Sequence, residues 1–264
     1  MHRFFLPAAS IQKEDVLFPS EVARQLKQVL HQHEGQVVIV LDNQGLEYEV
    51  KLVSFQAHAA QGQIQIRRTA QGEPTFKLAL FLCLSQREKF EWMLQKCTEV
   101  GVNAFTPVIS SRSLVQEPEE ACKKYPRWQK IIQEAAEQSG RGRLPMLFPP
   151  LSFEQAVRES QINNRNACLL WEGERTHGLR QALNGIFPGQ TQLALLVGPE
   201  GGFSETEANL AVNSGLSSVS LGARILRMET AALVASALVL YEAGEMDTKK
   251  MIENYSSFGG AVGP

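Results

Sequence analysis

The chain has few cysteines and no long apolar segment. Its 264 residues include four cysteines, at positions 83, 97, 122 and 168. No two of them have the spacing of a zinc knuckle or a CxxC redox pair, so we expect reduced thiols, no bound metal and a cytoplasmic protein. The apolar runs stop well short of the about 20 residues of a membrane helix, and no N-terminal stretch has the pattern of a signal peptide. A membrane protein is therefore not expected.

Three common ligand motifs are also missing. The sequence has no GxGxxG after a predicted strand, no GxxxxGK[ST] and no GxSxG. These absences argue against an ordinary dinucleotide-binding fold, a nucleoside triphosphate loop and a serine hydrolase. A ligand site has to be sought in other glycine-rich segments.

The net charge of −2 gives no general signal for nucleic-acid binding. Basic residues nevertheless gather in the middle of the chain. They form a series of Lys123, Lys124, Arg127 and Lys130, followed by Arg141 and Arg143. Such a series can form a phosphate-binding face. A solvated helix face balanced by glutamates explains the pattern equally well, so the sequence leaves both interpretations open.

Residues 1–70 have the pattern of a small β-rich domain. Its predicted strands cover residues 37–41, 46–55 and 62–68. Residues 20–30 fit a short helix with Ser20 as its N-cap. Short strands with one helix favour a small barrel, and the polar segment 70–74 is the best linker candidate.

From residue 76 onward, strands and helices alternate along the chain. The predicted strands cover residues 76–84, 104–109, 167–171, 193–197 and 216–221. The predicted helices cover residues 88–100, 127–138, 153–159 and 204–215. The last of these begins with Ser204 and Glu207, which have the spacing of a capping box. This alternation predicts an α/β fold with a parallel sheet.

The final predicted helix, residues 229–243, is apolar nearly all round. A helix without a polar face is expected to be buried on every side, by another domain or, as the C-terminal position favours, by a second subunit. The sequence therefore predicts a homodimer. The polar tail at 246–264 is expected to be disordered.

Two loops of unusual composition follow predicted strands near the C-terminus. The first holds three glycines, a proline and a carboxylate within residues 198–202, and the second holds two arginines and a carboxylate within residues 224–229. Clustered glycines let the backbone adopt positive φ and approach a ligand closely. Two such loops at the ends of neighbouring strands predict a site for a small molecule.

These loops carry a resemblance to a known family. The stretches VGPEGGFSxxE and LGxRILRxETA resemble the C-terminal signature of the RsmE family of bacterial ribosomal RNA methyltransferases. Three further features agree with that family. They are Arg3-Phe4-Phe5, then Lys96-x-x-Glu99-x-Gly101-Val102 before Pro107, and Arg127-Trp128 leading to Ala136-x-Gln138-Ser139-x-Arg141. The resemblance extends from the first residues to about Gly244.

The resemblance implies a function and a fold. Members of the family use S-adenosylmethionine to methylate N3 of a uridine in 16S ribosomal RNA of the 30S subunit. The catalytic domain, expected here at residues 74–245, is of the SPOUT type, with a parallel sheet and a C-terminal trefoil knot. Residues 1–70 would form a PUA-like β-barrel that helps to bind RNA. The knot follows from the resemblance alone, since chains do not ordinarily thread loops.

The resemblance also implies site residues at the matching positions. The cofactor-binding set is Leu170, Leu196, Val197, Gly198, Glu200, Gly201, Leu221, Gly222, Ile225 and Leu226. The residues expected to bind RNA are Arg67, Arg68, Arg112, Lys123, Lys124, Arg141 and Arg143. Leu196, Leu221 and Leu226 could instead be ordinary core residues.

The chemistry of the reaction restricts the catalytic set. Uridine N3 carries a proton, and its loss leaves negative charge shared with O2 and O4. The site therefore needs a base within hydrogen-bond reach and a cation near the developing anion. We expect Arg227 to be the cation, because a guanidinium can donate two hydrogen bonds to one group. Glu229 or Glu200 is the candidate base, although Glu229 could instead stabilise a helix N-terminus or pair with Arg227.

Two other functions stay open at this stage. One is an RNA-binding module of the same fold without catalysis, which the intact glycine and arginine stretches disfavour. The other is an α/β enzyme that binds a different nucleotide-like ligand, such as a dinucleotide. Competition between S-adenosylmethionine and NAD would separate the second alternative from a methyltransferase.

Overall fold

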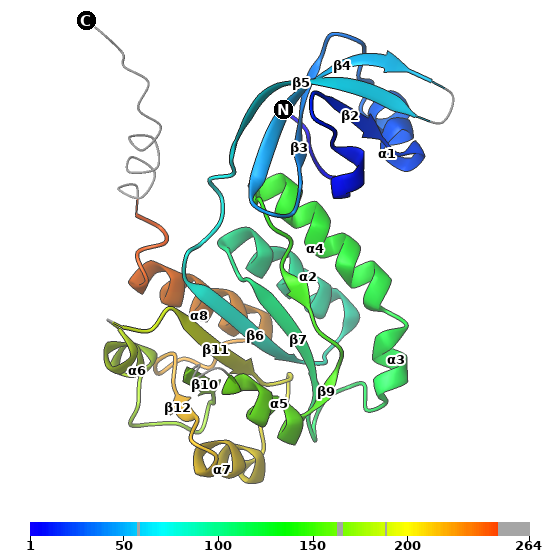
Figure 1. Ribbon diagram of the computed structural model, residues 1–264. Coiled ribbons are helices and arrows are strands. Elements are labelled where there is room, and N and C mark those ends of the chain that lie inside the picture. The colour runs from blue at the N-terminus through cyan, green and yellow to red at the C-terminus, as the bar shows by residue number, and fades with distance from the viewer. Residues whose placement is uncertain (57–58, 163–165, 188, 248–264) are drawn as a thin grey trace, which may run out of the picture. The chain divides into compact units, whose positions relative to one another are not determined.

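The computed structural model describes residues 1–56, 59–162, 166–187 and 189–247, and its chain forms two units (Figure 1). The first unit holds Met1–Glu73 together with Gln133–Leu144, and the second holds Pro74–Ile132 and the chain from Pro145 onward. The break after Glu73 falls inside the predicted linker. The sequence did not predict that residues 133–144 belong with the N-terminal unit. Most of the tail that was expected to be disordered lies outside the described residues.

The first unit is built on a five-stranded sheet with the order β1-β3-β4-β5-β2. Its strands are β1 (Arg3–Phe5), β2 (Asp15–Phe18), β3 (Val37–Leu41), β4 (Leu46–Phe55) and β5 (Ala60–Thr69). All neighbours are antiparallel except β1 and β3. One short 3-10 helix covers Ala8–Ser10, and α1 (Ser20–Arg24) continues as a π-helical turn over Gln25–Val29. Phe18, Leu26 and Val50 form part of a closed apolar core.

The end of α4 (Tyr125–Ser139) and the segment after it pack within the first unit. Ala136 joins a small apolar cluster with Phe5, Ile39 and Leu41. The backbone N–H of Phe5 donates to Oε1 of Glu137 at 3.0 Å. These contacts join residues far apart in the sequence, which explains why a local pattern could not place this segment.

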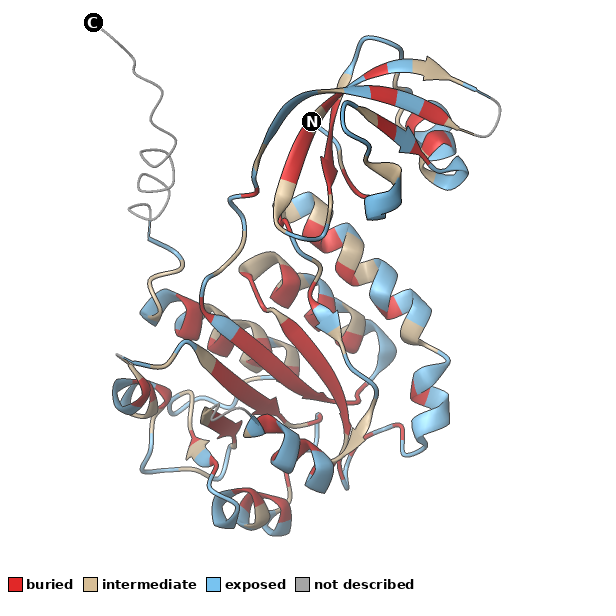
Figure 2. Cartoon of the chain, in the orientation of Figure 1, coloured by how far each residue is buried: buried red, intermediate tan, exposed pale blue. Residues whose placement is uncertain are grey.

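The second unit contains a seven-stranded sheet in which every pairing is parallel. The main order is β12-β10-β11-β6-β7-β8, and β9 also pairs with β7. The strands are β6 (Lys77–Cys83), β7 (Ala104–Ile109), β8 (Met146–Leu147), β9 (Leu151–Ser152), β10 (Asn166–Leu170), β11 (Gln192–Val197) and β12 (Ser217–Val219). The central strands are buried along almost their whole length (Figure 2). The predicted parallel α/β sheet is confirmed.

Helices lie along this sheet. They are α2 (Arg87–Val100), α3 (Pro118–Cys122), the first part of α4, α5 (Phe153–Ser160), α6 (Leu179–Ile186), α7 (Glu205–Asn213) and α8 (Met228–Glu242). Helices α2 and α8 pack against each other, and α8 also packs against β6 and β11. The predicted capping box is present, since Ser204 and Glu207 each accept the other's backbone N–H. Helix α2 ends at Gly101, whose φ of 113° suits glycine.

Helix α8 is partly buried within one chain, so the part of its predicted burial that a second subunit would supply stays a prediction. Ala235, Val239 and Leu240 are fully buried, whereas Leu238 and Tyr241 keep 44% and 65% of their surface exposed. The helix is apolar nearly all round, so an apolar face stays in contact with solvent. None of the described helices is both long enough and apolar enough to span a membrane.

Candidate active site

A cavity of about 560 Å³ opens where β10, β11 and β12 end. Its wall consists of three segments, within residues 170–175, 197–202 and 219–231, together with Lys89 of α2. We name residues 198–202 the glycine loop and residues 220–227 the arginine loop. In parallel α/β sheets, ligands bind outside the carboxyl ends of the strands, so the position of this cavity is that of a ligand site.

Most of the predicted cofactor and catalytic residues line this cavity. They are Leu170, Val197, Gly198, Glu200, Leu221, Gly222, Ile225, Leu226, Arg227 and Glu229. Leu196 and Gly201 are not on the wall. Leu196 is 1% exposed in the middle of the sheet, and neighbouring strand residues point to opposite faces. Gly201 lies against the side chain of Arg112 instead.

Sequence reasoning missed several lining residues. Trp171, Glu172 and Arg175 follow β10 and form the third part of the wall, and Lys89 reaches it from α2. Arg175 donates from Nη1 to the carbonyl oxygen of Glu172 at 2.6 Å. The glycine and arginine loops could be found by composition, whereas the segment after β10 has no comparable signal.

The arginine loop presents unpaired positive charge. Arg224 and Arg227 are exposed, and neither forms an ion pair within the described part of the chain. The pairing of Arg227 with Glu229 that the sequence left open does not occur there. Both guanidinium groups are therefore available to an anion at the cavity.

Glu229 lies in the first turn of α8, where the helix dipole favours a carboxylate. Its Oε2 atom is buried and has no hydrogen-bond partner. A buried carboxylate oxygen without a donor is costly in free energy. Because Glu229 lines the cavity, a donor on a bound molecule could satisfy this oxygen.

Glu200 has a different environment. Its Oε1 accepts the backbone N–H of Gln86 at 3.3 Å and the ammonium of Lys89 at 3.2 Å. Burial alone would raise the pKa of Glu200, but hydrogen bonds from backbone N–H groups and from Lys89 outweigh it and hold the pKa below its usual range. A carboxylate stabilised in this way is a weak proton acceptor near neutral pH. Of the two candidate bases, Glu229 fits that role better.

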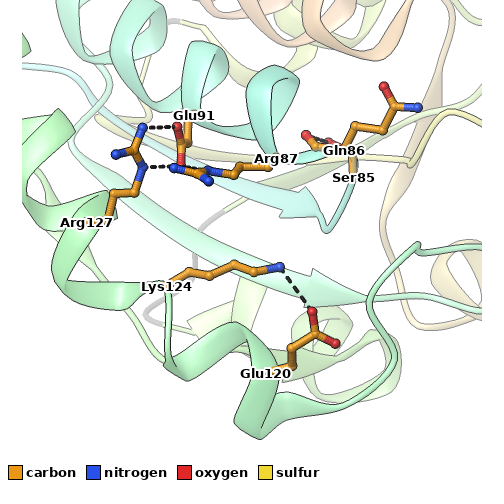
Figure 3. Close-up of polar contacts among 7 residues, drawn as sticks. All are labelled: Ser85, Gln86, Arg87, Glu91, Glu120, Lys124 and Arg127. Atoms are coloured by element: carbon orange, nitrogen blue, oxygen red, sulfur yellow. Dashed lines mark hydrogen bonds and ion pairs between the residues drawn. The ribbon is translucent and has the colours of Figure 1, made fainter.

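Two basic residues, Lys124 between α3 and α4 and Arg127 in the first turn of α4, are neutralised by carboxylates (Figure 3). Arg127 donates to both carboxylate oxygens of Glu91, at 2.5 and 2.8 Å, and Arg87 donates to the same carboxylate at 3.0 Å. The hydrogen bond from Arg127 is the main reason that the pKa of Glu91 is lowered. Lys124 pairs with Glu120 at 3.3 Å. At these positions the balanced helix face is the better description, while Lys123 stays exposed.

The predicted contact of Arg141 with phosphate is not supported by its position in the first unit. Arg141 is 2% exposed, and it donates to both oxygens of Glu73, at 3.0 and 3.1 Å. The neighbouring chain is also tightly packed, since a Cβ on Gly142 would collide with that of Ala70. Arg143 is exposed, although its Nη2 donates to the carbonyl oxygen of Gln44 at 2.5 Å.

The two arginines of β5 also differ from each other. Arg68 pairs with Glu47 and Glu49, at 2.5 and 2.7 Å. Arg67 is exposed and lies 5.7 Å from the centre of the Tyr48 ring, within reach of a cation–π interaction. Arg67 is therefore more available to a phosphate than Arg68, whose charge is paired with two carboxylates.

The family model for the RNA methyltransferase domain matches residues 72–240, which include the whole large sheet and the cavity. The fold and site are therefore those of an RNA methyltransferase domain. The chain is 30% identical over 249 residues to ribosomal RNA small subunit methyltransferase E of Bacillus subtilis, covering 92% of this chain and 97% of that protein. The chain belongs to the ribosomal RNA small subunit methyltransferase E (RsmE) family, as the resemblance implied.

Two other relatives agree with this assignment. The protein of the same name from Synechocystis is 33% identical over 244 residues, covering 90% of this chain and 77% of that protein. A crystal structure of ribosomal RNA small subunit methyltransferase E from Neisseria gonorrhoeae, bound to S-adenosyl methionine, has a TM-score of 0.81 and 31% identity. It covers 91% of this chain and 97% of its own.

Proposed function

We propose that the chain is an S-adenosylmethionine-dependent methyltransferase that methylates N3 of a specific uridine in 16S ribosomal RNA of the 30S subunit, in the cytoplasm. The observation that carries this proposal is the cavity between the glycine loop and the arginine loop. The family membership and the cofactor bound to the gonococcal relative support the choice of ligand. The target atom rests on the resemblance of the two loop motifs.

The residues of the cavity fit the cofactor chemically. Leu170, Val197 and Leu226 supply apolar surface for an adenine ring, and Gly198 and Gly222 let the backbone approach it. The unpartnered buried oxygen of Glu229 matches a hydroxyl or ammonium donor of such a ligand. When bound, this cofactor supplies a methyl group already activated on a sulfonium, so no metal is required.

The chain's own residues can perform the remaining chemistry. Glu229 is the proposed acceptor of the proton on uridine N3, because its carboxylate lines the cavity and Glu200 is engaged elsewhere. Arg227 is the proposed donor to the negative charge that develops on O2 and O4 of the base. Both residues lie where the arginine loop meets α8, so one segment would carry both roles.

The finer features of the fold are proposed with the function. A trefoil knot in residues 74–245 is supported by the non-sequential strand order β12-β10-β11-β6 and by the three loops that meet at the cavity. A PUA-like barrel at residues 1–70 is supported by the five-stranded sheet and its closed core. Exposed Arg67, Lys123 and Arg143 are the best remaining candidates for phosphate contacts, which give affinity without sequence choice.

A homodimer is proposed from α8. Its exposed apolar side chains, including Leu238 and Tyr241, are the kind of surface that a second subunit covers. Because the arginine loop runs directly into this helix, covering the exposed face would also order the cavity wall.

The decisive test is transfer of labelled methyl from S-adenosylmethionine to 30S subunits that lack their native uridine methylation, followed by nucleoside analysis. The expected product is N3-methyluridine. Bound cofactor without transfer would contradict the proposed substrate but leave the cofactor assignment standing. No cofactor binding, or displacement of the cofactor by NAD, would favour the alternative of an enzyme for another nucleotide-like ligand. Naked 16S RNA in parallel shows which form of the substrate is used.

A further inference from the structure

The glycine loop has an inner side that lines the cavity and an outer side that contacts other elements. Val197, Gly198 and Gly202 are on the cavity wall, whereas Gly201 is not. Three glycines in five residues give this loop many backbone conformations when it is unrestrained. The contacts that the loop makes with other elements therefore decide how well this wall is ordered before a ligand arrives.

Helix α2 holds the loop at Glu200. The carboxylate Oε1 accepts one hydrogen bond from the backbone N–H of Gln86, just before the helix, and one from Lys89 in its first turn. A carboxylate at a helix N-terminus is also stabilised by the helix dipole. The contact between Lys89 and Glu200 joins residues that are 111 positions apart in the sequence.

The segment after β7 holds the loop at its next residue. Nη1 of Arg112 donates to the carbonyl oxygen of Gly201 at 2.6 Å. A Cβ on Gly201 would lie 3.3 Å from Cδ of Arg112, so the alkyl part of Arg112 also lies against the loop. The neighbouring Ser111 donates its backbone N–H to Glu207 at 2.8 Å, which secures the start of α7 on the far side of the loop. Arg112 itself does not line the cavity.

We propose that Arg112, from outside the cavity, and Lys89, on the cavity wall, are positioning residues that hold the glycine loop, so that the loop forms a fixed wall for the cofactor. This inference rests on the proposed function for the identity of the ligand. The sequence predicted that Arg112 binds RNA. In this proposal Arg112 instead acts through Gly201. Ordering the loop in advance lowers the entropy lost on binding, so releasing it weakens ligand affinity.

The chain offers matched variants. Arg112→Met keeps the alkyl cover of Gly201 and removes the donor, and Lys89→Met removes the ammonium. Arg112→Lys and Lys89→Arg keep a cation that can still donate, so these variants are expected to hold the loop nearly as well as the original residues. Lys96→Met is the control, because Lys96 pairs with Glu99 in the same helix at 2.8 Å. The exposure of the two pairs is similar: the Lys96 and Glu99 side chains are 34% and 28% exposed, and those of Lys89 and Glu200 are 31% and 34% exposed.

The first readout needs no ligand. Hydrogen exchange of the backbone amides in residues 198–203 is expected to accelerate about fivefold in Arg112→Met and about threefold in Lys89→Met, with an unchanged melting temperature. The smaller effect of Lys89 follows from its longer hydrogen bond, 3.2 Å against 2.6 Å for Arg112. It also follows from the backbone N–H of Gln86, which still donates to Glu200 when Lys89 is replaced. The control is expected to exchange like the original protein. Unchanged exchange in both test variants would overturn the proposal.

The second readout is the dissociation constant of S-adenosylmethionine, measured by titration calorimetry. Arg112→Met is expected to weaken binding about fivefold and to leave the KM for 30S subunits and the kcat at saturating cofactor within twofold. Weaker use of 30S subunits with unchanged cofactor affinity would overturn the proposal and make Arg112 an RNA contact. If the original protein binds no cofactor, the proposed function fails, while the exchange experiment still decides whether the loop is held.

Discussion

The two loops of the cavity differ in how much the chain itself holds them. The glycine loop is tied to Gln86, Lys89 and Arg112 by hydrogen bonds that join distant parts of the sequence. The arginine loop is tied to a distant segment only at its first residue, where Ser220 donates to His177 and accepts from Leu179. Beyond that residue the described hydrogen bonds of the loop are local, such as the one between Gly222 and Ser220, and Ile225 is 84% exposed. Among the described residues, the chain thus holds the glycine loop at Glu200 and Gly201 and leaves the arginine loop beyond Ser220 with local hydrogen bonds.

This difference suggests that the two loops have different roles in binding. A wall that is ordered in advance can bind the part of a ligand that never changes, which is the cofactor. A wall that is less held and carries free cations can close against the bound cofactor and also adapt to a large anionic substrate. Arg224 and Arg227 are on the second wall and make no ion pairs among the described residues.

The largest effect is expected from Arg227→Ala. Removing the cation beside the developing negative charge should slow methyl transfer about 100-fold in single-turnover measurements. Cofactor affinity and melting temperature should stay as they are, because Arg227 is exposed and unpaired. Arg180→Ala is the control, since that arginine is 84% exposed on α6 and outside the cavity. Retained activity would mean that the arginine loop does not carry the charge chemistry.

The next largest effect is expected from Leu238→Asp on α8. A charge on the exposed apolar face should weaken the dimer at least about 30-fold, which sedimentation would detect as a folded monomer. Val212→Asp on α7 is the control, because Val212 is a similarly exposed apolar residue in another helix. If the original chain already sediments as a monomer, the arginine loop is completed by ligand alone.

A smaller effect is expected from Glu207→Gln, which tests the contacts at the start of α7, just after the glycine loop. Its carboxylate accepts hydrogen bonds from the backbone N–H groups of Ser111 and Ser204, at 2.8 and 2.9 Å. A glutamine amide has a single acceptor oxygen, and its NH2 group would face the other backbone N–H. The free energy of unfolding, measured with urea, should therefore fall by about 1–3 kcal/mol. Glu205→Gln, at an exposed position in the same turn, is the control and should change the free energy of unfolding little. Equal stabilities would show that these contacts do not hold the loop's far end.

The smallest effect is a pH dependence. Burial alone would raise the pKa of Glu207, but hydrogen bonds from Ser111 and Ser204 outweigh it and lower the pKa below 4.5. A carboxylate with a lowered folded-state pKa stabilises the fold above its ordinary pKa, and that contribution is lost as the pH falls through the folded value. Unfolding free energy should therefore fall below about pH 4.5, and less steeply in Glu207→Gln. Parallel pH curves for the two proteins would contradict this.

Local patterns predicted much of this molecule. The buried apolar runs of β6 and β11 indicated a parallel sheet, the Ser204–Glu207 spacing indicated the start of α7, and the glycine and arginine loops indicated the cavity. Each of these signals lies within a few consecutive residues.

Features that depend on distant contacts could not be predicted. Arg141 looked like a surface cation, but its partner Glu73 is 68 positions away. The contact of Arg112 with Gly201 spans 89 positions and changes the expected role of that arginine. The apolar composition of α8 predicted a buried helix, and the chain itself buries one face of it. Composition does not say which neighbours a single chain supplies, so the covering of the other face stays a prediction.

Hydrogen exchange with and without S-adenosylmethionine tests the central claim about the two loops most directly. At saturating cofactor, amides of residues 220–227 should exchange at least about tenfold more slowly, while those of residues 198–202 should change little because the chain already holds them. Protection at neither loop, or protection confined to another part of the chain, would contradict the assignment of this cavity as the cofactor site.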